Sequence, residues 1–150
     1  MHWMILPLKR YAEFSGRSRR KEFWMFMLLQ LIIACVLVIL TLVTGGSLAA
    51  LEGSEAASAV AAGSLSFTYI LFGIWLLAVI IPSIALNVRR LHDRDMSGWW
   101  YLGYIVASFV PVVNLIAFVA YVVVMVLPGT PGPNRYGEDP KGQGMDEVFA

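Results

Sequence analysis

Residues 23–44 read FWMFMLLQLIIACVLVILTLVT, a run of 22 residues without a charged side chain. A helix of this length rises about 33 Å, which is enough to cross a hydrocarbon core of about 30 Å. The run also exceeds the apolar core of a cleaved signal peptide, which holds about 7 to 15 residues. We therefore predict a retained first membrane span, with Ser18 as the N-cap of its helix.

Charge and hydropathy extend this prediction to the whole chain. The 150 residues are 59% hydrophobic and 14% charged, and the mean hydropathy is +0.72. All 21 charged residues fall into four short patches, separated by charge-free stretches at 23–51, 56–88 and 96–134. A soluble fold could not hide this much apolar surface. The sequence therefore predicts an all-α, polytopic helical membrane protein, formed as a single domain over residues 1–150.

The basic residues set the predicted orientation. Residues 1–22 contain six of the eleven Lys and Arg residues, and the positive-inside rule places this N-terminus in the cytoplasm. The connection at 45–64 is rich in Gly, Ala and Ser and contains no Lys or Arg, so it should face the periplasm. A second span is predicted at 65–86, with a bend at Pro82 in its last turn. The arginines that follow it return the chain to the cytoplasm.

The third apolar run, residues 99–127, is compatible with two topologies. Its 29 residues exceed what one perpendicular span needs, and Pro111 lies near its middle. In the topology that we favour, the run is one tilted and kinked span, which leaves the Gly- and Pro-rich tail, residues 128–150, in the periplasm. In the alternative, Pro111 and Asn114 mark the tip of a hairpin that gives four membrane helices, although each arm is short for a full crossing.

The first polar cluster is FSGRSRRKEFW, residues 14–24. Its simplest role is to anchor the protein, because basic residues beside a membrane attract anionic lipid by about 1 kcal/mol each and aromatic residues favour the interface. A binding role is the alternative. If the helix begins near Ser18, then Arg17, Arg20 and Trp24 share one helical face, where they could hold a lipid phosphate or a partner's carboxylate.

The second polar cluster is NVRRLHDRDMSGWW, residues 87–100. A charged cytoplasmic loop that enforces topology explains it most simply. Its arginines could instead bind a phosphate, and His92 beside Asp93 could supply a general acid or base. Catalysis is disfavoured, because adjacent residues on a helix point in different directions and no second His-rich or carboxylate cluster is present. The candidate binding residues of this cluster are Arg89, Arg90, His92, Asp93, Arg94 and Trp99.

The sequence contains no catalytic constellation, no metal-ligand spacing and no cofactor motif. Cys35 is the only cysteine and lies in the first apolar run, so an internal disulfide is excluded. No ionisable residue lies deep in any predicted span, which argues against a proton-coupled transporter. We therefore predict a protein that is not an enzyme and uses no cofactor or metal. Its expected partner is the lipid bilayer, in particular anionic lipids, and it is not expected to bind nucleic acid.

Four motifs occur along the chain in a fixed order. They are Gly16-Arg17-x-x-Arg20-x-Glu22-Phe23-Trp24, Arg89-Arg90-Leu91-His92-Asp93, Ser97-Gly98-Trp99-Trp100 and Pro128-Gly129-x-x-Gly132-x-Asn134-x-Tyr136-Gly137. With them the chain resembles, from residue 14 to residue 140, the bacterial inner-membrane family called domain of unknown function 805, the YhaH-like family. The resemblance implies a small multi-span inner-membrane protein with no established activity, cofactor or catalytic residue. The sequence departs from the family pattern in Asp95-Met96 and in a longer small-residue loop after the first span.

Three functions remain under comparison. The favoured one is non-enzymatic binding of a partner or of anionic lipid through a basic cytoplasmic face, formed by residues 17–21 and 89–94. The alternative is a subunit of a pore or transporter, which the Pro-broken third run suggests. A membrane enzyme that acts on a phosphate-bearing lipid through His92 and Asp93 is the least favoured.

Overall fold

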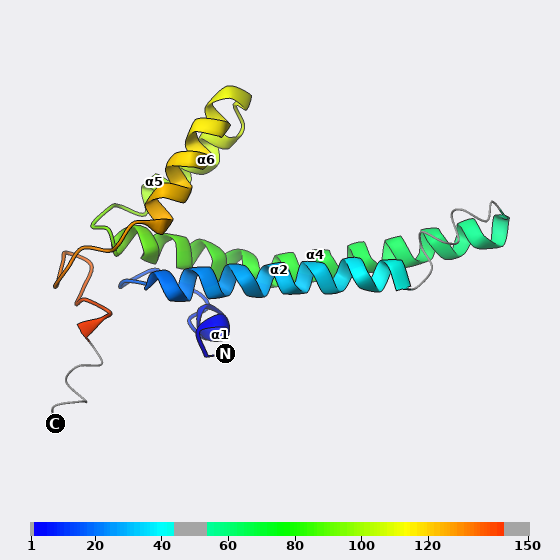
Figure 1. Cartoon of the computed structure of the whole chain (residues 1–150), viewed down its shortest axis with the longest axis horizontal. Helices are drawn as coiled ribbons and strands as arrows, with labels where there is room; N and C mark the ends of the chain where they lie inside the picture. Colours follow the sequence, from blue (N-terminus) through cyan, green and yellow to red (C-terminus); the bar gives the residue numbers. More distant parts are fainter. Residues whose placement is uncertain (1, 44–53, 143–150) are drawn as a thin grey trace. The chain divides into compact units, whose positions relative to one another are not determined.

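The computed structural model describes residues 2–43 and 54–142, in which every named element is a helix. In chain order the helices are α1 (His2–Lys9), α2 (Arg20–Val43), α4 (Glu55–His92), α5 (Trp99–Ser108) and α6 (Pro111–Val126) (Figure 1). The predicted all-α class is confirmed. The described residues divide into two compact units: a terminal unit, residues 2–26 and 81–142, and a two-helix unit, residues 27–43 and 54–80.

Helix α2 contains the predicted first span. It begins at Arg20, three residues before the predicted start, and is described as far as Val43. The prediction of Ser18 as N-cap is wrong: the N–H of Phe23 donates to the carbonyl of Arg19, and the Ser18 hydroxyl is buried and has no hydrogen-bond partner among the described residues. Arg20 and Lys21 therefore lie within the helix, whereas Arg17 and Arg19 precede it.

Helix α4 is longer than predicted at both ends. It has 38 residues, a length of about 57 Å. Residues 55–64, predicted as loop, are helical, because alanine is the best helix former and the Ser54 hydroxyl accepts a hydrogen bond from the N–H of Ala57 at 3.1 Å. The rest of that predicted loop, residues 45–53, lies outside the described residues. At the other end the helix continues past Pro82 to His92, so Pro82 does not lie in the last turn.

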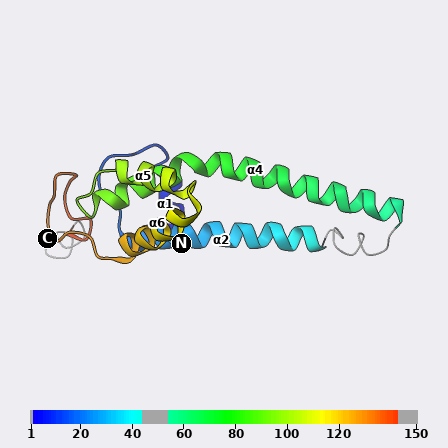
Figure 2. The ribbon, with the colours of Figure 1, turned by 90° about the horizontal axis from the view of Figure 1, so that it is seen from above.

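Helices α2 and α4 are the two described helices that are long and apolar enough to cross a membrane. Within the two-helix unit they lie side by side (Figure 2). The indole N–H of Trp75 donates to the amide oxygen of Gln30 at 2.7 Å, and the hydroxyls of Thr41 and Thr68 are 2.7 Å apart. Large apolar side chains point outward, as lipid-facing helices require.

The third apolar run forms two helices that fold back on each other as a hairpin (Figure 1). The rings of Tyr104 in α5 and Tyr121 in α6 stack with their centroids 4.5 Å apart. The favoured single kinked helix is therefore wrong. Pro111 has no N–H to continue α5 and forces Val110 into an extended conformation, with φ −102° and ψ 113°, so the chain turns and Pro111 starts a new helix.

The lengths of the hairpin helices limit how far they reach. Helix α5 has 10 residues and α6 has 16, which correspond to about 15 Å and about 24 Å. Both are shorter than a hydrocarbon core of about 30 Å. The hairpin brings the chain back to the end of α4, where the tail begins.

Candidate functional site

Five buried charged side chains gather in the terminal unit, and we call them the arginine cluster. They come from the segment before α2, from the first turn of α2, from the last turn of α4 and from the residue that follows α4. None has more than 6% of its surface exposed. Three are cations and two are carboxylates, so the cluster carries one excess positive charge. Its members are Arg17, Glu22, Arg89, Arg90 and Asp93.

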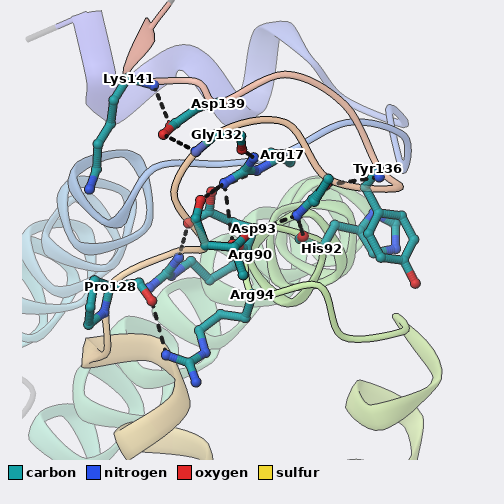
Figure 3. A network of polar contacts seen from close by, with 12 residues as sticks. Arg17, Arg90, His92, Asp93, Arg94, Pro128, Gly132, Tyr136, Asp139 and Lys141 are labelled. Atoms are coloured by element: carbon teal, nitrogen blue, oxygen red, sulfur yellow. Dashed lines mark hydrogen bonds and ion pairs between the residues drawn. The ribbon is translucent and has the colours of Figure 1, made fainter.

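Asp93 connects three segments that are far apart in sequence (Figure 3). One carboxylate oxygen accepts a hydrogen bond from Nε of Arg17 at 3.0 Å, and the other accepts one from Arg90, one helical turn earlier. The backbone carbonyl of Asp93 accepts a hydrogen bond from the N–H of Thr130 at 2.8 Å. The N-terminal segment, the end of α4 and the tail are therefore joined at one residue.

The arginines also satisfy backbone carbonyls that have no helical partner. Arg17 donates to the carbonyls of Gly132 and Thr130, each at 2.6 Å. Arg90 donates to the carbonyl of Met125 at 3.2 Å and to that of Leu127, at the C-terminal end of α6. The last four carbonyls of a helix lack intrahelical partners, and a cation is favourable there. These arginines thus stabilise the end of the hairpin and the start of the tail.

The second ion pair of the cluster is less well bonded. Nη2 of Arg89 lies 3.4 Å from Oε1 of Glu22, and both side chains are buried. The two terminal nitrogens of Arg89 and Oε1 of Glu22 have no hydrogen-bond partner in the described residues. Buried polar atoms are normally hydrogen-bonded, so this pair leaves bonding capacity unused.

The tail folds into a turn that packs against His92 (Figure 3). The backbones of Asn134 and Gly137 exchange hydrogen bonds of 3.0 and 3.1 Å, and the Asn134 amide donates to the carbonyl of His92 at 2.9 Å. This places the ring of Tyr136 parallel to that of His92, with centroids 3.8 Å apart. Nδ1 of His92 lies 3.3 Å from the carbonyl of Gly16. His92 is therefore engaged with the turn and not with the Asp93 carboxylate, which does not support an acid–base pair.

A carboxylate and a glycine hold the rest of the tail in place. Asp139 accepts hydrogen bonds from the N–H groups of Lys141 and Gly132, at 2.9 and 3.2 Å, and these bonds lower the pKa of its carboxyl. Gly129 passes so close to Asp93 that a Cβ atom there would overlap the Asp93 carboxylate. Only glycine fits at that position without a displacement.

The structure brings together four of the nine predicted binding residues: Arg17, Arg89, Arg90 and Asp93. His92 and Arg94 lie at the edge of this group, where Arg94 donates to the carbonyl of Pro128 at 3.0 Å. Trp24 and Trp99 are 45% and 77% exposed and lie outside it.

The predicted helical face of Arg17, Arg20 and Trp24 does not form. Helix α2 starts only at Arg20, so Arg17 precedes the helix and turns toward Asp93. Arg20 is exposed, and it donates to the carbonyl of Val126 at 3.1 Å. The residues that the prediction missed are Glu22, Gly129 and Thr130. Glu22 and Gly129 belong to two of the four motifs that carry the family resemblance, and that membership was the available signal for them.

Comparisons with known proteins match the chain over most of its length. Residues 11–138 match the family described as "Protein of unknown function (DUF805)". The Inner membrane protein YhaI of Escherichia coli strain K12 is 38% identical to the chain over 144 residues, which cover 94% of this chain and 97% of YhaI. The Inner membrane protein YhaH of the same strain is 38% identical over 144 residues, which cover 94% of this chain and 98% of YhaH. No solved structure shows significant similarity.

Proposed function

The chain belongs to the DUF805 family of inner-membrane proteins of unknown function, and from this premise we propose that it is a non-enzymatic protein that binds anionic lipid through a basic cytoplasmic face. The exposed cations at the start of α2 carry the proposal. Arg20 and Lys21 are exposed beside Trp24, and Lys9 is exposed at the end of α1. Each such cation attracts an anionic surface by about 1 kcal/mol.

The buried arginines have a different role in this proposal. The donors of Arg17 and Arg90 are already used by Asp93 and by backbone carbonyls. They hold together the folded end of the protein that carries the exposed cations. Lipid contact is therefore assigned to the exposed residues Lys9, Arg20 and Lys21, and not to the arginine cluster.

A specific topology accompanies the proposal. The contacts of Arg17 with Thr130 and Gly132 support placing the N-terminus and the tail on one side of the membrane. The positive-inside rule makes that side the cytoplasm. Helices α2 and α4 are then the two full crossings, and the hairpin of α5 and α6 enters the membrane from the cytoplasm and returns to it.

Cysteine labelling tests the topology. In a Cys35→Ala background, a cysteine introduced by Lys141→Cys should resist a membrane-impermeant maleimide in cells with a permeabilised outer membrane, and react after lysis. Glu55→Cys, at the opposite end of α4, is the matched control and should react in the intact cells. Reaction of the Lys141→Cys protein before lysis would place the tail in the periplasm and contradict the topology.

Lipid retention tests the function. The triple variant Lys9→Gln, Arg20→Gln, Lys21→Gln should lose most of its salt-sensitive binding to phosphatidylglycerol, because the screened attraction of exposed charges is removed. The control variant, Arg135→Gln with Lys141→Gln, removes two exposed cations from the tail and should keep the binding. An unchanged lipid profile in the triple variant, read by native mass spectrometry of the purified protein, would reject the proposal.

A pore or transporter subunit is the second candidate, and the short hairpin favours it. Helices that end within the membrane occur where their ends are buried in protein or line an aqueous cavity. The hairpin tip instead exposes apolar side chains such as Val112 and Leu115, which are 78% and 69% exposed. Solute flux into liposomes that contain the purified protein would support this candidate over lipid binding.

A further inference from the structure

A cavity of about 390 Å³ opens in the terminal unit beside Arg17, which also joins Asp93 to the tail. Its walls come from α1, from the segment that leads into α2, and from the tail. Trp3 and Leu6 form an apolar wall, and the charged lining residues are Arg10, Arg17, Arg19, Glu22 and Glu138. The volume lies within the range of about 300–1,000 Å³ that is typical of small-molecule sites.

One wall of the cavity offers an unused acceptor. The Glu22 side chain lines the cavity and is 2% exposed, and its Oε1 atom, which is buried and faces Arg89, accepts no hydrogen bond in the described residues. Its one ion pair within residues 2–43 and 54–142, to Arg89, is 3.4 Å long. An ionised carboxylate can only accept hydrogen bonds, so a ligand group that fits here is a donor, and a positively charged donor fits best.

The cavity also offers a cation without a carboxylate partner. Arg10 is held by both oxygens of Glu13, at 2.6 and 2.7 Å, and Arg17 is held by Asp93 and the tail. The guanidinium of Arg19, by contrast, lies over the ring of Trp3 at 5.6 Å and forms no ion pair within the described part of the chain. It remains available for a phosphate.

The cavity therefore presents an acceptor for an amine and a cation for a phosphate, at the position where α2 begins its apolar run. Trp24 follows two residues after Glu22 and is exposed, and tryptophan side chains are enriched at the depth of lipid head groups. We propose that this cavity binds a phosphoethanolamine head group, with its ammonium on Glu22 and its phosphate on Arg19. The site is specific for a zwitterion and is distinct from the general attraction of anionic lipid by Lys9, Arg20 and Lys21.

A ligand series tests the amine contact in the full-length protein in detergent. Dioctanoyl phosphatidylethanolamine should bind about tenfold tighter than dioctanoyl phosphatidylcholine, because a trimethylated amine has no N–H to donate to Glu22. Equal affinities for the two lipids, or no binding of the ethanolamine lipid, would overturn the proposal. Free phosphoethanolamine separates the two sources of the head group. If the protein binds free phosphoethanolamine, the head group alone suffices. If it binds the lipid but not free phosphoethanolamine, the acyl chains are required.

A matched pair of variants tests the phosphate contact. Arg19 and Lys21 both place their charges over the ring of Trp3, at 5.6 and 5.7 Å, but only Arg19 lines the cavity. Arg19→Gln should weaken the binding of the ethanolamine lipid about tenfold. Lys21→Gln should change the affinity for this lipid by less than about twofold. Equal losses in both variants would leave only general charge attraction and overturn the site.

Two further comparisons keep the result interpretable. Glu22→Gln leaves Arg89 buried without a carboxylate partner, so the lipid affinity of this variant is compared with that of the wild type only if the two proteins unfold at the same temperature. Arg19→Gln disturbs no ion pair of the described residues and is the primary variant. The triple variant at Lys9, Arg20 and Lys21 should still bind the ethanolamine lipid more tightly than the choline lipid, although it loses most of its binding to phosphatidylglycerol. The head-group site and the anionic-lipid face can therefore fail independently.

Discussion

In the terminal unit Arg17, Arg90 and Asp93 are buried and bonded across distant segments, whereas the two-helix unit joins its helices through isolated polar contacts such as that of Gln30 with Trp75. The terminal unit includes a tail with little regular structure, whose backbone groups need partners from elsewhere. Helices α2 and α4 satisfy their own backbone groups within the two-helix unit, as lipid requires. Charge is thus concentrated where non-helical backbone has to be held.

The same comparison predicts where substitutions are costly. A buried cation that loses its partner keeps its desolvation penalty, which makes such a change expensive. A polar contact between two membrane helices contributes much less, because each group finds other partners when the helices separate. Substitutions in the terminal unit should therefore lower the free energy of unfolding more than equivalent substitutions in the two-helix unit do.

Asp93→Asn should have the largest effect on stability. It leaves Arg17 and Arg90 buried with no carboxylate between them, a loss of about 3–5 kcal/mol in the free energy of unfolding. Unfolding by denaturant in detergent micelles measures it. Asp95→Asn is the control: its pair with Arg135 has side chains 45% and 60% exposed, and its loss should remain below about 1 kcal/mol. Equal losses in the two variants would remove the basis of the comparison.

Gly129→Ala should follow. A Cβ atom at this position overlaps the Asp93 carboxylate, so the tail has to move away from α4, at about 1–3 kcal/mol. Limited proteolysis of the tail and thermal unfolding should both report the change. Gly142→Ala, with open space around the added Cβ, should behave as wild type. A stable, protease-resistant Gly129→Ala protein would show that this close approach is dispensable.

Tyr121→Phe tests how the hairpin is attached. The Tyr121 hydroxyl donates to the side-chain oxygen of Asn87 in α4, and Asn87 is only 2% exposed. Removing the hydroxyl should cost about 1 kcal/mol, because it leaves a buried acceptor unsatisfied. Tyr104→Phe removes a hydroxyl from a ring in the same stack and should cost less. If the two variants unfold alike, ring stacking and not the hydrogen bond attaches the hairpin.

The helical class and the first span could be predicted because both depend on the length of continuous apolar runs in the sequence. The 22 uncharged residues at 23–44 exclude most alternatives, and α2 matches them to within a few residues. The start of α4 was mispredicted for a local reason: small residues at 55–64 suggested a loop, although their alanines favour helix. The hairpin was left open because Pro111 is compatible with both a kink and a turn, and the choice depends on the packing of α5 on α6.

The arginine cluster could not be predicted, since burial of a charge depends on partners that are remote in sequence. Arg17 and Asp93 are 76 residues apart, and Arg17 and Gly132 are 115 apart. Without those contacts, a basic segment beside a span is expected to be exposed. The glycine at 129 indicates that something passes close by, but the sequence does not say that this neighbour is the carboxylate of Asp93.

The smallest effect is expected in the two-helix unit. A double-mutant cycle with Gln30→Leu and Trp75→Phe should give a coupling energy of about 0.6 kcal/mol, because the indole N–H and the amide find other partners when α2 and α4 separate within the membrane. Each single variant and the double variant would be unfolded in the same micelles as Asp93→Asn. A coupling as large as the Asp93→Asn loss would show that the two-helix unit also depends on a polar contact, and the contrast between the units would then reflect only the number of such contacts and not their kind.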